Sequence, residues 1–103
     1  MPRKHPRLEL DAAIHPPIRF SLVAVLSTEG ECAFQQICHR LAVNAATLSK
    51  NVAYLETAGY VEVRKGFVGK RPRTWLSLTP AGLEAFNRHT AALRAISRVG
   101  NTS

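Results

Sequence analysis

The stretch NAATLSKNVAYLETAGYVEVRKGFVGKRPRTWLSL, residues 44–78, changes its hydrophobic period partway along, and this change decides the fold. In the first half, Leu48, Val52 and Leu55 recur at helical spacing. They follow Asn44, a residue type that commonly caps the N-terminus of a helix. In the second half, apolar and polar residues alternate in two runs, as they do in strands with one buried face. The stretch therefore predicts a helix that is followed by a β-hairpin.

The predicted hairpin consists of the runs YVEVRKGF, residues 60–67, and TWLSLT, residues 74–79. The segment VGKRPR, residues 68–73, joins these two runs and contains both glycine and proline, which favour turns. We expect this segment to form a long tip with three positive charges. Phe67 and Trp75 are expected to pack the hairpin onto the helices rather than to stack on nucleic-acid bases.

Two further helices are predicted before this stretch. Residues 34–41 place apolar side chains at positions i, i+3, i+4 and i+7, which is the spacing of one helix face. Residues 42–44 separate this short helix from the next one. A longer helix is predicted from Pro17 to Gly30, because proline suits the first turn of a helix and glycine commonly ends one.

A last helix is predicted after the hairpin, with Thr79 as its N-cap, Pro80 at its first position, and an end near Gly100. The segment ECAF, residues 31–34, is too short to assign alone. The fold class that follows is mostly α with a small β-hairpin, in the order of a winged helix-turn-helix (α+β). The predicted divisions are a basic disordered tail over residues 1–7, one domain over residues 8–98, and a C-terminal tail over residues 99–103.

The charge balance indicates a polyanionic partner. Of the 103 residues, 14 are Lys or Arg and only seven are Asp or Glu, which gives a formal net charge of +7. After Glu62 the sequence has one acidic residue, Glu84, among eight basic ones. Such an excess favours nucleic acid as the partner, and an anionic membrane surface is the weaker competitor.

Several classes of function are disfavoured. No apolar run approaches the roughly 18 residues that a membrane span needs, and no signal-peptide pattern follows the first residues, so we expect a cytoplasmic protein with no membrane partner. The four histidines and seven carboxylates form no recognisable nucleophile, acid–base or phosphate-binding motif. We therefore expect no enzymatic activity, no cofactor and no bound metal.

The ordered motifs LSKNVAYLETAGYVEV, GKRPRTWLSLT and TPAG resemble those of small MarR/ArsR-like winged helix-turn-helix transcriptional regulators. The resemblance extends from Leu10 to Phe86. It implies a homodimer that binds operator DNA, with the first and last helices at the dimer interface. This chain departs from the family pattern at Ala46, Thr47 and Asn51, where relatives often carry a Gly-Asn pair and a later His. The base preference of relatives therefore does not transfer.

The predicted DNA-binding residues form two groups. Within the predicted recognition helix, polar side chains lie away from the apolar stripe, and Asn and Lys are residue types that pair with adenine and guanine. In the hairpin, basic side chains are expected to hold phosphates or to enter the minor groove. The recognition-helix set is Ala46, Thr47, Ser49, Lys50 and Asn51, and the hairpin set is Arg64, Lys65, Lys70, Arg71 and Arg73.

The last helix has more apolar surface than so small a domain plausibly covers, which also favours a homodimer. The predicted interface residues are Ile18, Leu22, Val25, Leu83, Phe86, Leu93 and Ile96. The predicted function is sequence-specific binding of double-stranded DNA by a transcriptional regulator, most simply a repressor. The operator, the regulated genes and any small-molecule effector are not readable from the residues.

Three alternatives remain open at this point. The basic face of the same fold can dock an acidic protein partner, or it can bind RNA. Cys32, Cys38 and His39 also raise the possibility of a regulator that responds to a metal ion or to thiol oxidation. The helical phase of Cys38 places it on the apolar stripe of its helix, where a free cysteine commonly serves as a small core residue.

Overall fold

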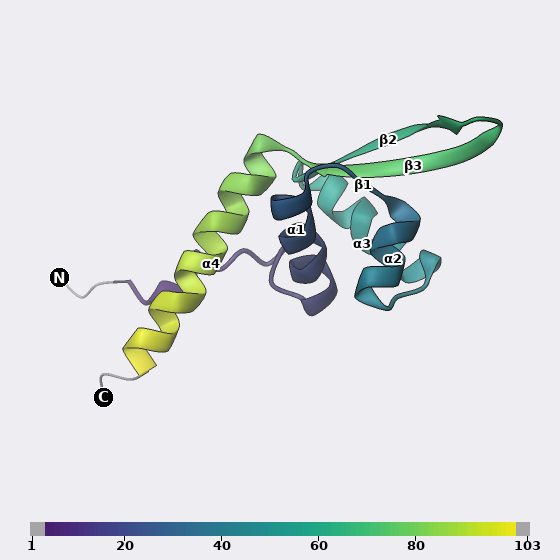
Figure 1. Ribbon diagram of the computed structural model, residues 1–103. Helices are drawn as coiled ribbons and strands as arrows, with labels where there is room; N and C mark the ends of the chain where they lie inside the picture. The colour runs from purple at the N-terminus through teal and green to yellow at the C-terminus, as the bar shows by residue number, and fades with distance from the viewer. Residues whose placement is uncertain (1–3, 101–103) are drawn as a thin grey trace.

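The computed structural model describes residues 4–100 and has a small helical body with two long extensions (Figure 1). The body contains helices α1 (Pro17–Glu29), α2 (Phe34–Leu41) and α3 (Ala45–Thr57). The strands are β1 (Cys32–Ala33), β2 (Val61–Val68) and β3 (Arg71–Leu78), and the last helix is α4 (Pro80–Gly100). In Figure 1 the β2–β3 hairpin projects from one end of the body, and the C-terminal half of α4 extends from the other. The molecule is therefore elongated, 61 Å along its longest axis and 24 × 21 Å across it.

The helices lie where the hydrophobic periods predict them, and local chemistry sets their ends. The side chain of Asn44 accepts a hydrogen bond from the N–H of Thr47 at 2.8 Å, so α3 begins at its predicted N-cap. Helix α2 has its predicted bounds and ends at Ala42, whose left-handed conformation (φ 54°) turns the chain toward α3. The predicted fold class, mostly α with a β-hairpin, is confirmed.

The sheet contains one strand that the sequence did not predict. Strand β1 pairs antiparallel with β3, with Cys32 opposite Leu76 and Ala33 opposite Trp75, so the strand order is β1-β3-β2. Two residues are too few to carry a periodic signal, and only the partner strand reveals β1.

The tip of the hairpin is shorter than predicted. Strands β2 and β3 remain paired as far as Val68 and Arg71, so the turn contains only Gly69 and Lys70. Gly69 has a φ of 63°, a conformation that glycine adopts without strain. Among the described residues, the outer edge of β3 has no neighbouring strand beyond its short pairing with β1, so Pro72 interrupts no sheet hydrogen bonds there. The prediction of a long tip over residues 68–73 is therefore wrong, and most of its charges lie on the strands.

The core lies where α1, α2 and α3 meet the base of the sheet. The predicted apolar stripe of α3, formed by Leu48, Val52 and Leu55, is buried, which confirms the helical phase. The remaining members of the core cluster are Ile14, Leu22, Val23, Leu26, Ile37, Val61, Leu76 and Ala85.

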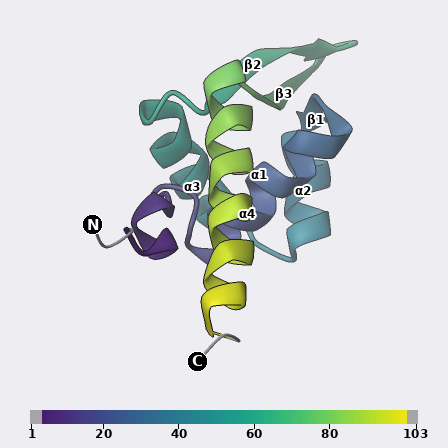
Figure 2. The same ribbon diagram turned by 90° about the vertical axis from the view of Figure 1, so that its left-hand side faces the viewer.

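The N-terminal segment packs against α4. A 3-10 helix, η1 (Pro6–Glu9), lies beside α4 in Figure 2, although the sequence placed Pro6 and Arg7 in a disordered tail. At the other end, α4 includes Val99 and Gly100, which the sequence placed in the C-terminal tail. Residues 1–3 and 101–103 of the two predicted tails lie outside the described residues.

A buried histidine fastens this N-terminal segment to α4. His89 is fully buried, and its Nδ1 accepts a hydrogen bond from the N–H of Asp11 at 2.9 Å. The carboxylate of Asp11 in turn accepts a hydrogen bond from the hydroxyl of Tyr60 at 2.6 Å. The rings of His15 and Phe20 lie 5.4 Å and 5.5 Å from the ring of His89. Within residues 4–100, the Nε2 atom of His89 is buried with no hydrogen-bond partner.

This environment should make the stability of the protein depend on pH. Burial, assisted by the nearby His15, lowers the pKa of His89 from its ordinary value of about 6.5, whereas the Asp11 carboxylate opposes this shift. Below pH 6.5 the unfolded chain then binds more protons at this position than the folded protein does. We therefore expect the free energy of unfolding, measured by urea titration, to fall as the pH is lowered from 8 to 5.

Two substitutions test whether His89 causes this dependence of stability on pH. His89→Asn keeps a side-chain acceptor for the Asp11 N–H but cannot be protonated, so we expect a shallower dependence on pH. His39→Asn, a matched change at an exposed histidine of α2, should retain the dependence of the original protein. Equal pH dependence in the His89→Asn variant and the original protein would contradict the assignment.

Candidate nucleic-acid interface

Helix α3 presents two of its predicted polar residues to solvent and holds two others at its flank. Ser49 and Lys50 are exposed, as is the neighbouring Ala46. Thr47 and Asn51 are half-buried, and the side-chain amide of Asn51 donates a hydrogen bond to the Thr47 carbonyl oxygen at 2.9 Å. The predicted DNA-binding residues of the recognition helix thus lie together on α3. The side chain of Asn51, however, is hydrogen-bonded within that helix. The face that α3 turns to solvent is centred on Lys50.

Sequence reasoning missed Tyr54, which lies one helical turn after Lys50 on the same outward face. Tyr54 is 50% exposed, and the guanidinium of Arg19 from α1 lies 3.9 Å from the centroid of its ring. Arg19 also donates to the carbonyl oxygen of Ala13 at 2.6 Å, so it connects α1, the preceding loop and α3. The sequence could have placed Tyr54 on this face, because it follows Lys50 by four residues in a predicted helix. No local pattern in the sequence predicts the contact between Tyr54 and Arg19.

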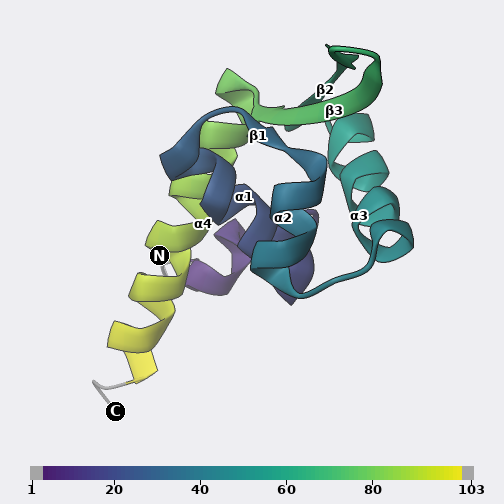
Figure 3. The same cartoon turned by 45° about the vertical axis from the view of Figure 1, so that its right-hand side comes forward.

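The β2–β3 hairpin lies directly beside α3 (Figure 3). Because paired residues of an antiparallel hairpin share a face, the register places Lys65 opposite Thr74 on the face that continues from the half-buried Val63 and the buried Leu76. Arg71 and Arg73 lie on the other face, opposite Val68 and Gly66, and Lys70 lies in the turn. Within residues 4–100, no ion pair involves Lys65, Lys70, Arg71 or Arg73.

Arg64 differs from the other predicted hairpin cations because it has a partner in the protein. Its guanidinium donates to both carboxylate oxygens of Glu31, at 2.7 Å and 3.0 Å, and lies 4.2 Å from the centroid of the Trp75 ring. These hydrogen bonds hold the pKa of the Glu31 carboxyl below its ordinary range. Arg64 therefore ties the base of the hairpin to the segment before β1.

A shallow hollow of about 600 Å³ separates α3 from the hairpin. Ser49 and Ala53 line it from the helix, and Lys65 and Thr74 line it from the strands. Glu56 also lines this hollow, at the end that is further along α3. A phosphate backbone that crosses the hollow would be attracted near Ser49 and Lys65 and repelled near Glu56.

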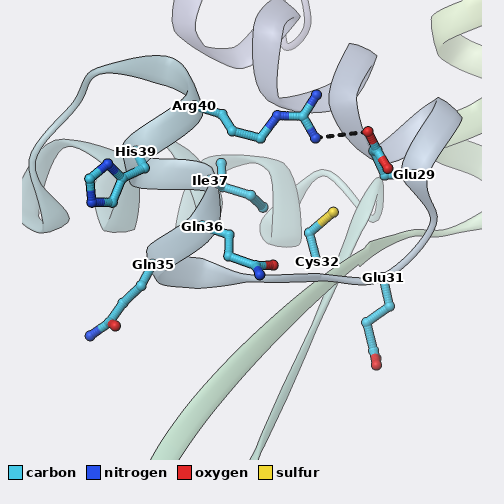
Figure 4. A pocket seen from close by; sticks show the side chains of 8 residues that line it. All are labelled: Glu29, Glu31, Cys32, Gln35, Gln36, Ile37, His39 and Arg40. Atoms are coloured by element: carbon cyan, nitrogen blue, oxygen red, sulfur yellow. Dashed lines mark hydrogen bonds and ion pairs between the residues drawn. The ribbon is translucent and has the colours of Figure 1, made fainter.

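Two of the three residues of the metal or thiol alternative line a second hollow, between the end of α1 and α2 (Figure 4). Its lining includes Cys32 and His39, together with an ion pair of 2.8 Å between Arg40 and Glu29. Burial and the neighbouring Glu29 raise the pKa of the Cys32 thiol, which disfavours the thiolate that metal binding and oxidation require. Cys38 packs against the apolar core. In the described part of the chain, no three His, Cys, Asp or Glu residues are grouped so as to hold a metal ion.

Among the predicted interface residues, Leu22 lies elsewhere than expected. It is fully buried in the core of its own chain, so it has no surface to offer a second copy. Ile18 and Val25 are half-buried on α1. Helix α4 directs Gly82, Ala85, His89 and Ala92 inward, and this leaves a second apolar stripe on its adjacent face. The residues of that stripe are Leu83, which is exposed, and Phe86, Leu93 and Ile96, which are half-buried.

Two consecutive helices joined by a tight turn, with an exposed polar face on the second helix and a paired basic hairpin beside it, define a winged-helix protein of the kind that binds nucleic acid. The family model described as winged helix DNA-binding domain matches residues 18–97, and the chain belongs to that family. The resemblance to small MarR/ArsR-like winged helix-turn-helix transcriptional regulators is confirmed. The β2–β3 hairpin is therefore the wing.

Solved structures of similar fold include the transcriptional regulator homologue protein from Pyrococcus horikoshii OT3. It is 26% identical with a TM-score of 0.80, and the match covers 88% of this chain and 89% of that one. NadR in complex with 4-hydroxyphenylacetate is 23% identical with a TM-score of 0.70, over 91% of this chain and 69% of that one. Bacillus subtilis PadR in complex with operator DNA is 14% identical with a TM-score of 0.62, over 70% of this chain and 46% of that one. No curated protein matches the chain in sequence.

The chain thus has the fold of a DNA-binding transcriptional regulator, and the family to which it belongs binds double-stranded DNA. Within residues 4–100, no helix combines the length and the apolar character that a membrane crossing requires.

Proposed function

We propose that the protein is a homodimeric transcriptional regulator that binds a specific double-stranded DNA operator and acts as a repressor. The observation that carries the proposal is the wing. Four of its cations, Lys65, Lys70, Arg71 and Arg73, have no ion-pair partner in residues 4–100. Lys65 lies on the hairpin face that borders α3, Lys70 lies in the turn, and Arg71 and Arg73 lie on the opposite face of the same hairpin. Concentrating like charges on one hairpin contributes nothing to folding, whereas it favours contact with phosphates.

In this proposal, α3 enters the major groove and the wing reaches the adjacent backbone or minor groove. Ala46, Ser49 and Lys50 face the base edges, where a lysine can donate to guanine acceptors. Thr47 and Asn51, at the flank of α3, are placed for the backbone contacts that fix the position of the helix. Arg64 acts mainly by holding the base of the wing, through its bonds to Glu31.

The homodimer is supported by the apolar surface that one chain leaves uncovered. The second stripe of α4 and the half-buried residues Ile18 and Val25 of α1 form apolar surface that a copy related by a two-fold axis would cover. Two recognition helices related in this way would read half-sites whose centres are roughly 34 Å apart, about one turn of B-DNA. Repression requires only that the operator be occupied, and the DNA-binding fold accounts for nearly all of residues 4–100.

The proposal is tested by selecting duplexes from a random pool and measuring their binding by fluorescence anisotropy across a salt series. We expect a motif with two-fold symmetry to be enriched. If the protein neutralises about 6–10 phosphates, its affinity should fall by about 10³–10⁵ between about 50 and 200 mM salt. Weak binding with no enriched motif would contradict the proposal and favour an acidic protein partner. Binding that survives competition by duplex DNA but not by RNA would instead assign the basic face to RNA.

A further inference from the structure

The tip of the wing carries a large apolar side chain that the fold does not use. Phe67 is 71% exposed, so the expectation that it packs the hairpin onto the helices is wrong. Val68 beside it is 52% exposed, whereas Trp75 at the base of the wing is half-buried and lies against Gly66 and Arg64. Single exposed apolar residues are common on protein surfaces, so exposure alone assigns no role to Phe67.

The strand register gives Phe67 a defined direction. Phe67 is paired with Pro72 and lies on the same face of the hairpin as Lys65 and Thr74, the face that borders the hollow beside α3. The pair Val68 and Arg71 separates it from the turn, so at about 3.3 Å per residue it lies only some 3–7 Å behind the tip. Phe67 and Pro72 thus form an apolar point on the side of the wing that faces the proposed DNA-binding surface.

The charges near Phe67 and Pro72 indicate what kind of molecule this pair binds. Lys65 lies on the same face of the hairpin, Lys70 lies in the turn, and Arg71 and Arg73 lie on the opposite face at the same end of the wing. The sequence from residue 63 to residue 83 contains no acidic side chain. A neutral apolar protein surface would gain nothing from these cations. Double-stranded DNA can bind both the cations and the apolar pair. Phosphates line the minor groove, and the stacked bases between them are apolar.

We propose that Phe67, backed by Pro72, is a wedge that enters the minor groove and partly unstacks one base step, so that the protein bends the DNA it binds. This inference rests on the proposed function. It adds that Phe67 makes binding depend on how easily the DNA sequence deforms. Phe and Pro are among the side chains that minor-groove proteins insert between bases, and such insertions bend the duplex by about 20–90°. The cations hold the phosphates on either side of the opened step.

The wedge has a consequence for sequence preference. Pyrimidine–purine steps such as TA and CA open more easily than other steps, so the protein should favour them where the wing enters. This preference requires no hydrogen bond to a base. Replacing the favoured step by GC should weaken binding by on the order of tenfold, in the range that a single mismatched position costs.

The experiment uses the full chain and a duplex that carries the selected site. The adenine analogue 2-aminopurine, whose fluorescence rises when it unstacks, is placed at each step of the wing region in turn. Donor and acceptor dyes on the two ends of the same duplex report bending. We expect the original protein to raise the fluorescence at one step and to shorten the distance between the ends. Phe67→Ala should abolish both signals while it keeps the salt dependence of binding, because it removes no charge.

Two variants serve as controls. Val68→Ala removes a neighbouring exposed apolar side chain from the opposite face of the hairpin and should keep both signals. Phe67→Leu retains an apolar wedge and should keep most of the bend. All three substitutions are at exposed positions, so none should affect folding.

The outcomes separate the wedge from the proposed function. If the original protein binds a selected duplex without bending it or unstacking a base, the wedge is excluded and the regulator remains. If Phe67→Ala bends DNA as the original protein does, the wedge is likewise excluded, and a loss of dimer in that variant on sizing would assign the tip to a protein contact. If the original protein binds no duplex, both proposals fail.

Discussion

Replacing Gly82 by alanine is expected to lower the free energy of unfolding by about 3 kcal/mol, the upper part of the range for overpacking a tightly packed site. Gly82 lies in the first turn of α4, where a Cβ atom would collide with the backbone carbonyl oxygen of Tyr60. It would also lie 2.9 Å from Cδ1 of Leu78. In an unobstructed helix the same change would stabilise by roughly 0.5–1 kcal/mol, so the collision reverses its sign.

The collision cannot be relieved cheaply because the Tyr60 carbonyl is held in place. It accepts a hydrogen bond from the N–H of Thr79 at 3.0 Å. The hydroxyl of Thr79 donates to the carbonyl oxygen of Gly59 at 2.7 Å and accepts from the N–H of Gly82 at 3.0 Å. Moving α4 away from Tyr60 would break this set of bonds and open the junction between α4 and the base of the wing.

The matched control is Gly100→Ala, in the last turn of the same helix, where nothing lies within 4 Å of the added Cβ atom. Its stability should be unchanged or slightly higher, by less than about 1 kcal/mol. Urea unfolding followed by circular dichroism measures both variants, at one protein concentration because the proposed dimerisation would shift the apparent stability. A Gly82→Ala protein as stable as the original would show that the approach of α4 to Tyr60 is not tight.

The parts of the fold that could be predicted depend on signals close together in the sequence. Helix α2 repeats its apolar residues within eight positions, and Asn44 caps α3 through a residue only three positions later. Strand β1 gave no such signal, because Cys32 and Ala33 become a strand only through residues more than 40 positions away. The tip of the wing was misjudged because the pairing of β2 with β3 continues through Pro72, a residue that usually weakens a strand assignment.

The candidate site was predicted in outline but not in its internal contacts. Charge counting located the wing, and the apolar stripe located the outward face of α3. Neither could show that Arg64 bonds to Glu31, 33 positions earlier, or that His89 accepts a hydrogen bond from Asp11, 78 positions earlier. Leu22 was misplaced for a related reason, because α1 is apolar around much of its surface and its periodicity does not distinguish the core face from an interface face.

Removing two wing cations, with Arg71→Ala and Arg73→Ala in one protein, is expected to weaken operator binding by about a hundredfold or more at low salt. A hydrogen bond to a charged group contributes about 1.5–3 kcal/mol, and about 1.4 kcal/mol corresponds to a tenfold change in affinity. Each lost phosphate contact should also reduce the slope of log K against log salt by about 0.9, so the slope should become flatter by about 1.8. Anisotropy titrations of the selected duplex across a salt series measure both quantities.

A second double variant separates contact from net charge. Arg94→Ala with Arg98→Ala also removes two positive charges, but from exposed positions on α4, at the opposite end of the molecule from the wing (Figure 1). Both proteins would carry a formal charge of +5, which is the original +7 less two. An effect of total charge alone would weaken DNA binding by the two variants alike. Any other electrostatic effect is screened within about 8–10 Å at physiological salt, so it depends on charges that lie close to the DNA. A flatter slope in the wing variant alone would require that Arg71 and Arg73 touch phosphates, whereas equal slopes in the two variants would show that the wing contributes only to the general positive field.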